Sequence, residues 1–248
     1  MHQKGGENVL RGIYTSCTGM VAEMDRQNVI ANNLANVNTV GFKKDNVTTV
    51  PFAELFLNAY NKRGISPVGR LGLGVQAVTQ YVNFTNGPVQ VTGNAADLAL
   101  EGDALFAIET PNGLRYQRAG NFVIDKDRYL VTQEGYRVMG ENGPIHLEEG
   151  DFAVTETGEI TQSDGVVNRL LLFSTDGMAK EGNYFYTTQN AQPAENYRIT
   201  QGALEHSNIN TVYEMVQMIT ATRNYDTNQR ALLAHDETLG KTVNELAK

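Results

Sequence analysis

Residues 31–42 read ANNLANVNTVGF, and this stretch decides how the chain is divided. Four asparagines fall within the seven residues from Asn32 to Asn38, although asparagine has a low helix propensity. A helix that ends here explains the last of them, because Asn38 or Gly41 can take the left-handed conformation of a helix C-terminus. It does not explain Asn32, Asn33 and Asn36, which lie inside the helical pattern. We therefore interpret these amides as polar positions that fix the register of packed helices, as a polar seam residue does in a coiled coil.

The residues before this stretch follow a helical pattern. From residue 10 to about residue 37, proline is absent and glycine is scarce. One seam repeats at alternating steps of four and three residues and comprises Ile13, Cys17, Met20, Met24, Gln27, Ala31 and Leu34. Because several of these side chains are small or polar, the seam favours a helix that packs against several neighbours. Residues 1–8 differ in composition, and we expect them to be a disordered extension.

The other end of the chain repeats the pattern. From residue 208 onward there is no proline, and Gly240 is the only glycine. Apolar positions form two runs separated by a polar interval: Ile209, Val212, Val216 and Ile219, then Leu232, Leu239, Val243 and Leu246. With Ser207 as the N-cap, the pattern predicts a helix of roughly 35–40 residues, a length typical of coiled coils and helical assemblies. Two ordinary amphipathic helices folded onto the core are the alternative, but a weak seam at each end favours packing between molecules.

The middle of the chain has the pattern of a β protein. Short apolar runs recur about every 8–12 residues between residues 104 and 173. Turn signals separate them, and each contains a glycine: Gly113, Gly135, Gly143, Gly158 and Gly165. Glycine is the residue expected where a tight turn needs a positive φ. The spacing predicts an antiparallel β core of the sandwich or barrel kind, so that the fold class is α+β with a long helix at each end.

Residues 43–97 fit neither class, and we expect an extended connector there. Within it, Pro51 to Tyr60 suggests a short helix, residues 64–74 a glycine-rich link, and Val75 to Phe84 a strand. The expected organisation is an extension (1–8), an N-terminal helix (9–42), the connector (43–97), a β core (98–200) and a C-terminal helix (201–248).

Composition and motifs argue against several functions. The formal net charge of −8, without a large basic cluster, argues against a nucleic-acid partner. Cys17 is the only cysteine, and the four histidines (His2, His146, His206 and His235) lack metal-ligand spacing. Gly72-Leu73-Gly74 superficially matches a dinucleotide fingerprint but lacks the strand before it and the helix after it. We expect no catalytic residue, cofactor, metal or small-molecule substrate. No apolar leader or membrane-length apolar stretch is present, so we expect a cytoplasmic protein or one exported by a route that needs no cleaved signal peptide.

Several motifs resemble those of one family. Residues 32–42 resemble the N-terminal signature of flagellar rod and hook proteins, and LRGIYTS (residues 10–16) with Gly19-Met20 resembles the start of their chains. Residues 93–102, Phe106 and YQRAGNF (residues 116–122) resemble the entry to the β core of the larger rod subunits. Residues 204–210, 214–219 and 223–225 resemble the C-terminal helix. Residues 104–106 depart from the pattern, because they read Ala-Leu-Phe where the family usually has a glycine and two aromatic residues.

The resemblance implies a structural subunit of the flagellar basal-body rod, of the distal type in preference to the proximal type. Such proteins assemble into a helical tube through their terminal helices and transmit motor torque to the hook. The implied partners are copies of the same chain, other rod subunits, the hook protein and the flagellar export apparatus, with surrounding ring proteins as a further candidate. An oligomeric β-sandwich binding or adhesin module with helical ends is the alternative, although the aromatic residues do not cluster as such a site requires.

We expect the polymerisation interface to use residues of both terminal helices and of the asparagine-rich stretch. The expected residues are Ile13, Met20, Met24, Asn32, Asn33, Leu34, Asn36, Asn38, Gly41, Phe42, Asn208, Val212, Met215, Val216, Ile219, Arg223, Leu232 and Leu239.

Overall fold

The structure is a computed structural model that describes residues 4–51, 55–61, 64–71, 74–162, 165–182 and 184–246. The chain forms two compact units. Unit 1 comprises Met1–Leu34, Asp45–Tyr81 and Thr211–Lys248, and unit 2 comprises Ala35–Lys44 and Val82–Asn210. Each unit is therefore discontinuous in sequence, and the predicted boundaries at residues 42, 97 and 200 fall elsewhere.

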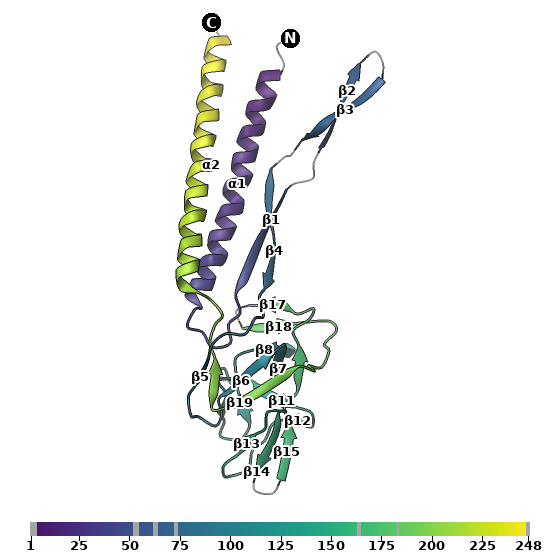
Figure 1. The fold of residues 1–248 in the computed structure, drawn as a ribbon, viewed down its shortest axis with the longest axis vertical. Coiled ribbons are helices and arrows are strands. Elements are labelled where there is room, and N and C mark those ends of the chain that lie inside the picture. Colours follow the sequence, from purple (N-terminus) through teal and green to yellow (C-terminus); the bar gives the residue numbers. More distant parts are fainter. Residues whose placement is uncertain are drawn as a thin grey trace. The chain divides into compact units, whose positions relative to one another are not determined.

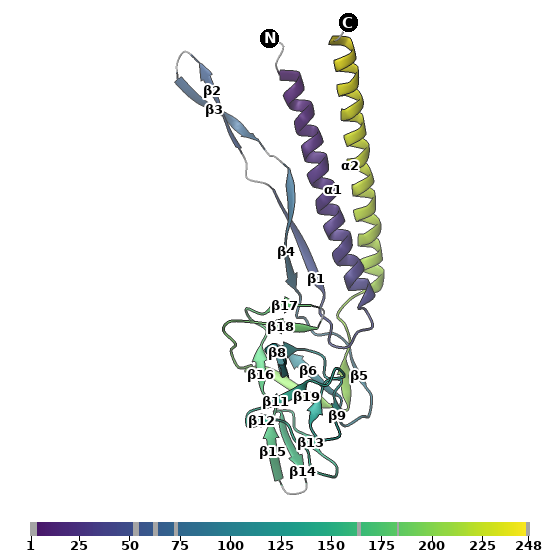
Figure 2. The same cartoon turned by 180° about the vertical axis from the view of Figure 1, so that it is seen from behind.

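Unit 1 contains the two long helices. Helix α1 spans Lys4–Ala35 and helix α2 spans Thr211–Leu246, and they run antiparallel, side by side, with both chain ends at the same tip (Figures 1 and 2). The α+β class and the packing of the terminal helices against each other are confirmed. Among the described residues, neither of these helices contains a segment apolar and long enough to cross a membrane.

The helix ends differ from two predictions. Helix α1 begins at Lys4, so residues 4–8 are helical where we expected a disordered extension. Helix α2 begins at Thr211, which places the N-cap position at Asn210 and not at Ser207. The prediction that Asn38 or Gly41 takes the left-handed conformation holds for Gly41, whose φ is 67°. Glycine fits this position because it has no Cβ to clash with its own backbone.

The rest of unit 1 is built from two strand pairs. Strand β1 (Asp45–Pro51) pairs with β4 (Val75–Val82), and β2 (Leu55–Asn61) pairs with β3 (Gly64–Leu71) in an antiparallel hairpin. The predicted strand from Val75 is confirmed, but the predicted short helix and glycine-rich link are wrong in the described residues 55–61 and 64–71. A short apolar run fits a helix or a strand equally well, and here hydrogen bonding to a partner strand decides.

Unit 2 is an antiparallel β structure. Its largest sheet has the order β17-β18-β8-β7-β11-β10-β9, with β12 paired to β11 and β16 paired to β7. These strands are β7 (Ala104–Thr110), β8 (Gly113–Gln117), β9 (Val123–Ile124), β10 (Leu130–Val131), β11 (Arg137–Gly140), β12 (Gly143–Pro144), β16 (Leu172–Ser174), β17 (Ala179–Glu181) and β18 (Phe185–Thr187). Smaller sheets join β13 (Ala153–Val154), β14 (Glu159–Gln162) and β15 (Gly165–Arg169), β6 (Leu98–Gly102) to β19 (Tyr197–Gln201), and β5 (Val89–Val91) to β20 (Ala203–Glu205).

Strand β7 organises the core of unit 2. Ala104, Phe106 and Ile108 face one buried cluster, while Leu105 and Ala107 face a second. Successive side chains of a strand point to opposite faces, so a strand that is apolar at every position is buried on both. This explains why its sequence is a continuous apolar run and not an alternating one.

The turn chemistry of the core is confirmed in detail. The five glycines predicted to occupy turns all have positive φ, between 84° at Gly158 and 120° at Gly165. Residues 145–147 contribute only the isolated bridge of His146 with Tyr129, and residues 166–173 are divided between β15 and β16.

Candidate functional site

The seam between α1 and α2 is built from small and polar residues. A Cβ added at Gly12 would lie 2.3 Å from Nε2 of His235, and one added at Gly19 would lie 2.9 Å from Nδ2 of Asn228. Further along, Nδ2 of Asn224 donates to Oε1 of Glu23 at 3.2 Å. Between these three contacts, the spacing in residues along α1 equals the spacing in the reverse direction along α2. The two helices therefore keep one antiparallel register.

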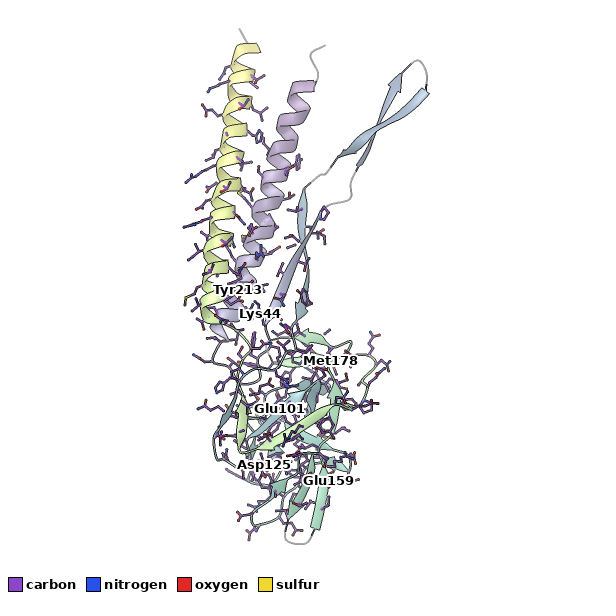
Figure 3. All side chains as sticks on the ribbon, in the orientation of Figure 1. Lys44, Glu101, Asp125, Glu159, Met178 and Tyr213 are labelled. Carbon is purple, nitrogen blue, oxygen red and sulfur yellow. The ribbon has the colours of Figure 1, made fainter. Side chains whose placement is uncertain are left out.

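The apolar positions of α2 lie away from this seam. Val212, Val216 and Ile219 are 72%, 52% and 53% exposed, whereas Glu214 and Ala221 are buried at 1%. Tyr213, labelled in Figure 3, is exposed as well. Helix α2 therefore buries Glu214 and Ala221 within the chain and leaves an apolar face near its start uncovered, which is unusual for a helix of a monomeric protein.

The seam predicted for α1 is only partly covered within the chain. Met24 and Ala31 of that seam are exposed, and its other members are half-buried, while the buried residues within residues 12–35 are Ser16, Ala22, Val29, Ile30 and Asn33. Helices approach closely where side chains are small, and the residues of α1 that meet α2 most closely include Gly12 and Gly19, which lie outside the predicted seam.

Asn33 has its partners inside unit 1. Its Nδ2 donates to the carbonyl of Asp45 at 2.9 Å, and its Oδ1 accepts from the Asp45 amide at 3.0 Å. The same Nδ2 lies 3.5 Å from Oε2 of Glu214, and Asn33 is 1% exposed. Within the chain, the Asn33 amide therefore joins α1 to β1, and a contact of Asn33 with neighbouring subunits stays a prediction.

The other residues of the asparagine-rich stretch belong to the end of the helix and to unit 2. Oδ1 of Asn36 accepts from Oγ1 of Thr39 at 3.3 Å, in the turn that follows α1. Asn38 is exposed, and Asn32 and Leu34 are half-buried. Asn36 is buried, so its amide also serves the turn within the chain.

Gly41 and Phe42 are buried as well, and their contacts lie within unit 2. The Gly41 amide donates to the Glu205 carbonyl at 2.8 Å, and a Cβ at Gly41 would lie 2.4 Å from the amide nitrogen of Ala119. Phe42 is 2% exposed, with the Lys180 ammonium 4.1 Å from its ring centroid. Both residues hold this segment against the β core.

Asn208 ties three segments of unit 2 together. Its Oδ1 accepts from the Lys44 amide at 2.9 Å, and its Nδ2 donates to the carbonyls of Asn83 at 2.8 Å and Thr85 at 3.0 Å. Lys44 is labelled in Figure 3. Asn208 thus acts in joining the residues after α1 to those before α2.

The sequence analysis missed a buried ionic cluster beside these contacts. We call it the ion triad, and it consists of Lys43, Arg118 and Glu205, whose side chains are no more than 2% exposed. Oε1 of Glu205 accepts from Nζ of Lys43 at 2.8 Å, and Oε2 accepts from Nε of Arg118 at 2.5 Å. Burial lowers the pKa of Lys43 to about 8, with the Arg118 charge adding to the effect and Glu205 opposing it.

Arg118 is fully satisfied although it is buried. Besides Glu205, its guanidinium donates to the carbonyls of Leu100 (2.7 Å), Gly102 (2.6 Å) and Ala104 (2.7 Å), and to Oδ1 of Asn86 (3.0 Å). All five N–H donors of an arginine are thereby used. In the sequence, the only sign of this cluster was the single charged residue in YQRAGNF (residues 116–122), and nothing in the sequence indicated its partner.

The described residues show no other chemical centre. No group of His, Cys, Asp and Glu side chains within the described ranges could hold a metal ion. The contacts described above join separate segments of the chain, and the exposed apolar residues of α2 offer a surface for another protein. None of these contacts places a nucleophile beside a base.

Three protein families match segments of this chain. Residues 13–43 match the family described as flagella basal body rod protein, and residues 99–168 match the flagellar hook protein FlgE/F/G D1 domain. Residues 200–246 match the flagellar basal body rod FlgEFG protein C-terminal family. Each member of the ion triad lies in a different one of these segments.

Relatives match over nearly their whole length. The flagellar basal-body rod protein FlgG of Bacillus subtilis (strain 168) is 33% identical, and the alignment covers 95% of this chain and 99% of the relative. FlgG of Borreliella burgdorferi is 33% identical over 94% of this chain and 97% of the relative. FlgF of Rhizobium meliloti (strain 1021) is 33% identical over 95% and 97%. The chain therefore belongs to the flagellar basal-body rod proteins, and it is a structural subunit of that rod and not an enzyme.

Proposed function

We propose that this chain assembles into the rod as a helical tube, through the apolar face that α2 turns away from α1. We call this surface the outer face of α2, and it comprises Val212, Met215, Val216 and Ile219. All four side chains are between 49% and 72% exposed. A contiguous apolar surface of this kind marks a protein–protein contact.

The energetics favour assembly through this face. Burying a valine or isoleucine side chain stabilises by about 1.5–3 kcal/mol relative to leaving it exposed. Every subunit of a polymer repeats these residues, so a modest free-energy gain at each contact adds up to a large stabilisation of the whole tube. Met24 and Val21 of α1 are also about half exposed, at 48% and 54%, and would extend the same kind of contact.

The remaining interface residues are assigned by burial. Ile13, Met20, Leu232 and Leu239 are half-buried, and we infer that they line the edges of the helix pair. Arg223 and Asn38 are exposed, and we infer that they contact neighbouring subunits directly.

The names of the relatives support a proposal for the position in the rod. We infer a place in the distal part of the rod and a role in passing motor torque to the hook, because two of the relatives are named FlgG. Neighbouring copies, other rod subunits and the hook protein are the inferred partners, with ring proteins around the rod as a further candidate. We infer export by the flagellar apparatus without a cleaved signal peptide. The alternative of an adhesin module is not favoured, because the relatives are named as rod proteins.

A matched pair of substitutions tests the assembly face. Val216→Lys puts a charge on the outer face of α2, and Val166→Lys puts the same charge on β15, where the valine is 63% exposed. We expect both purified monomers to keep the unfolding midpoint of the original protein, and only Val216→Lys to abolish rods in basal-body preparations and swimming in cells. Rods of normal length with Val216→Lys would contradict the proposal.

A further inference from the structure

The ion triad brings together three segments that are far apart in the chain. Glu205 is at the centre: Oε1 accepts from Nζ of Lys43 (2.8 Å) and from the Gly87 amide (2.7 Å), and Oε2 accepts from Arg118 (2.5 Å). Nζ of Lys43 also donates to the Thr85 carbonyl at 2.8 Å. One carboxylate therefore joins the residues after α1, the residues before β5 and the β core.

Backbone hydrogen bonds around the triad connect the same three segments. The Gly41 amide donates to the Glu205 carbonyl, and the Asn83 amide donates to the Lys44 carbonyl, both at 2.8 Å. The amide of His206 donates to the Pro88 carbonyl at 2.9 Å. Residues 41–44, 83–88 and 203–208 thus form one hydrogen-bonded junction inside unit 2, which we call the root junction.

The charges of the triad do not balance. Two cations share one buried carboxylate, and the only further carboxylate acting on Lys43, that of Asp103, belongs to an exposed residue. Burying a charge is costly, and a buried ion pair often stabilises less than apolar residues of the same volume. For Lys43, the cost of desolvating the charge outweighs the attraction to Glu205, so its charged form is unfavourable at this site.

We propose that Lys43 and Glu205 together fix the register of the root junction, with Lys43 as a positioning residue whose charge does not add to the free energy of unfolding. Their geometry specifies which part of the chain after α1 lies against which part before α2. A lysine that donates to both Glu205 and Thr85 can do so in one register only, whereas apolar residues would permit several. The consequence for the rod rests on the proposed function: subunits whose root junction varies in register cannot repeat in a regular tube.

Lys43→Met tests the proposal, with Lys126→Met as the control. Lys126 is exposed at a hairpin, so its replacement removes one positive charge without touching the root junction. We expect Lys43→Met to unfold at the same denaturant concentration as the original protein or a higher one. We also expect amide exchange in residues 41–44 and 83–88 to accelerate about tenfold or more, while exchange in β7 stays unchanged. Lys126→Met should change neither measurement.

A second variant addresses the centre of the triad. Glu205→Gln leaves Lys43 and Arg118 buried without a carboxylate, so we expect it to unfold at a lower denaturant concentration. Adding Lys43→Met to Glu205→Gln should raise the midpoint again, because it removes one uncompensated charge. If the double variant is less stable than Glu205→Gln alone, Lys43 stabilises the fold and the proposal is wrong.

Assembly gives an independent readout. We expect cells carrying Lys43→Met to swim poorly and to have few complete rods, although the monomer is stable. A clear fall in the midpoint, with faster exchange throughout unit 2, would show that Lys43 only stabilises. Unchanged exchange in the root junction, or normal rods despite faster exchange, would also overturn the positioning role. The exchange measurement uses the isolated protein, so it distinguishes this failure from a failure of the assembly proposal, which Val216→Lys tests.

Discussion

Asn33 and Asp45 form a closed pair of hydrogen bonds, in which the side-chain amide of Asn33 both donates to and accepts from the backbone of Asp45, at 2.9 Å and 3.0 Å. An amide side chain offers the same donor and acceptor as a peptide group, so Asn33 acts as a neighbouring strand would toward the first residue of β1. Asparagine inside a helix is unfavourable locally, and this contact with β1 compensates for it.

Asn33→Ala should therefore destabilise the monomer. The substitution leaves a buried N–H and a buried C=O of Asp45 without these partners, and we expect a loss of about 2–4 kcal/mol in the free energy of unfolding. Urea unfolding followed by circular dichroism measures it. Asn28→Ala is the control, because Asn28 is exposed on the same helix and its replacement should stabilise by a few tenths of a kcal/mol. Equal effects of the two substitutions would rule out the special role of Asn33.

Gly41→Ala should be much more harmful than Gly135→Ala. Both glycines have positive φ, 67° and 87°, so both substitutions strain the backbone by about 1–2 kcal/mol. A Cβ at Gly135 meets no atom within 4 Å, whereas one at Gly41 meets the Ala119 backbone at 2.4 Å. We expect a total loss of about 3 kcal/mol or more for Gly41→Ala, because overpacking adds to the strain. Thermal unfolding of the two variants compares them directly, and similar melting temperatures would contradict the prediction.

The close approach of Gly12 to the His235 ring predicts that the effects of substitutions at these two positions on stability are coupled. Gly12→Ala should gain about 1 kcal/mol of helix propensity, but its Cβ would meet the His235 ring. In a His235→Ala background the gain should appear in full, giving a coupling energy of about 1 kcal/mol in a double-mutant cycle. Gly240→Ala is the control, since a Cβ there meets nothing within 4 Å and should stabilise α2 in either background. Additive effects of Gly12→Ala and His235→Ala would contradict the register of the helix pair.

Lys43 should give the stability a specific dependence on pH. Its pKa is lowered from 10.5 to about 8 in the folded protein by burial and by Arg118. Between these two values the unfolded chain binds more protons than the folded one, so the contribution of Lys43 to stability rises with pH over that window. Below pH 8 the full cost of the charge is present, and above pH 10.5 it is absent.

The difference in the free energy of unfolding between the original protein and Lys43→Met isolates this effect. We expect that difference to increase in favour of the original protein by up to about 3 kcal/mol from pH 8 to pH 10.5. Denaturant titrations at four or five pH values measure it, with Lys126→Met as the control for the loss of one positive charge. A difference that is constant with pH would mean that Lys43 is not held in an unfavourable environment.

The parts of the fold that the sequence predicted are those specified locally. The turn glycines and the two helical patterns depend on residues close together in the chain, and the structure agrees with them. The contacts that α1 makes with α2 and β1 could not be predicted in this way. Gly12, Gly19 and Asn33 carry no hydrophobic signal, and their roles depend on His235, Asn228 and Asp45. The ion triad was missed for the same reason: Lys43, Arg118 and Glu205 are isolated charges, and no spacing links them until the β core brings them together.

The matched register of α1 and α2 has a consequence for how such sequences can change in length. The steps from Gly12 to Gly19 and from Asn228 to His235 are both seven residues, so the two helices share one repeat. Inserting a single residue into one helix would rotate every later side chain by about 100° around the helix axis. A bulky side chain would then lie where Gly12 or Gly19 now faces α2. Removing seven residues from both helices would instead leave every pair matched. Insertions and deletions in natural relatives should therefore occur in sevens, and together at two places more than two hundred codons apart.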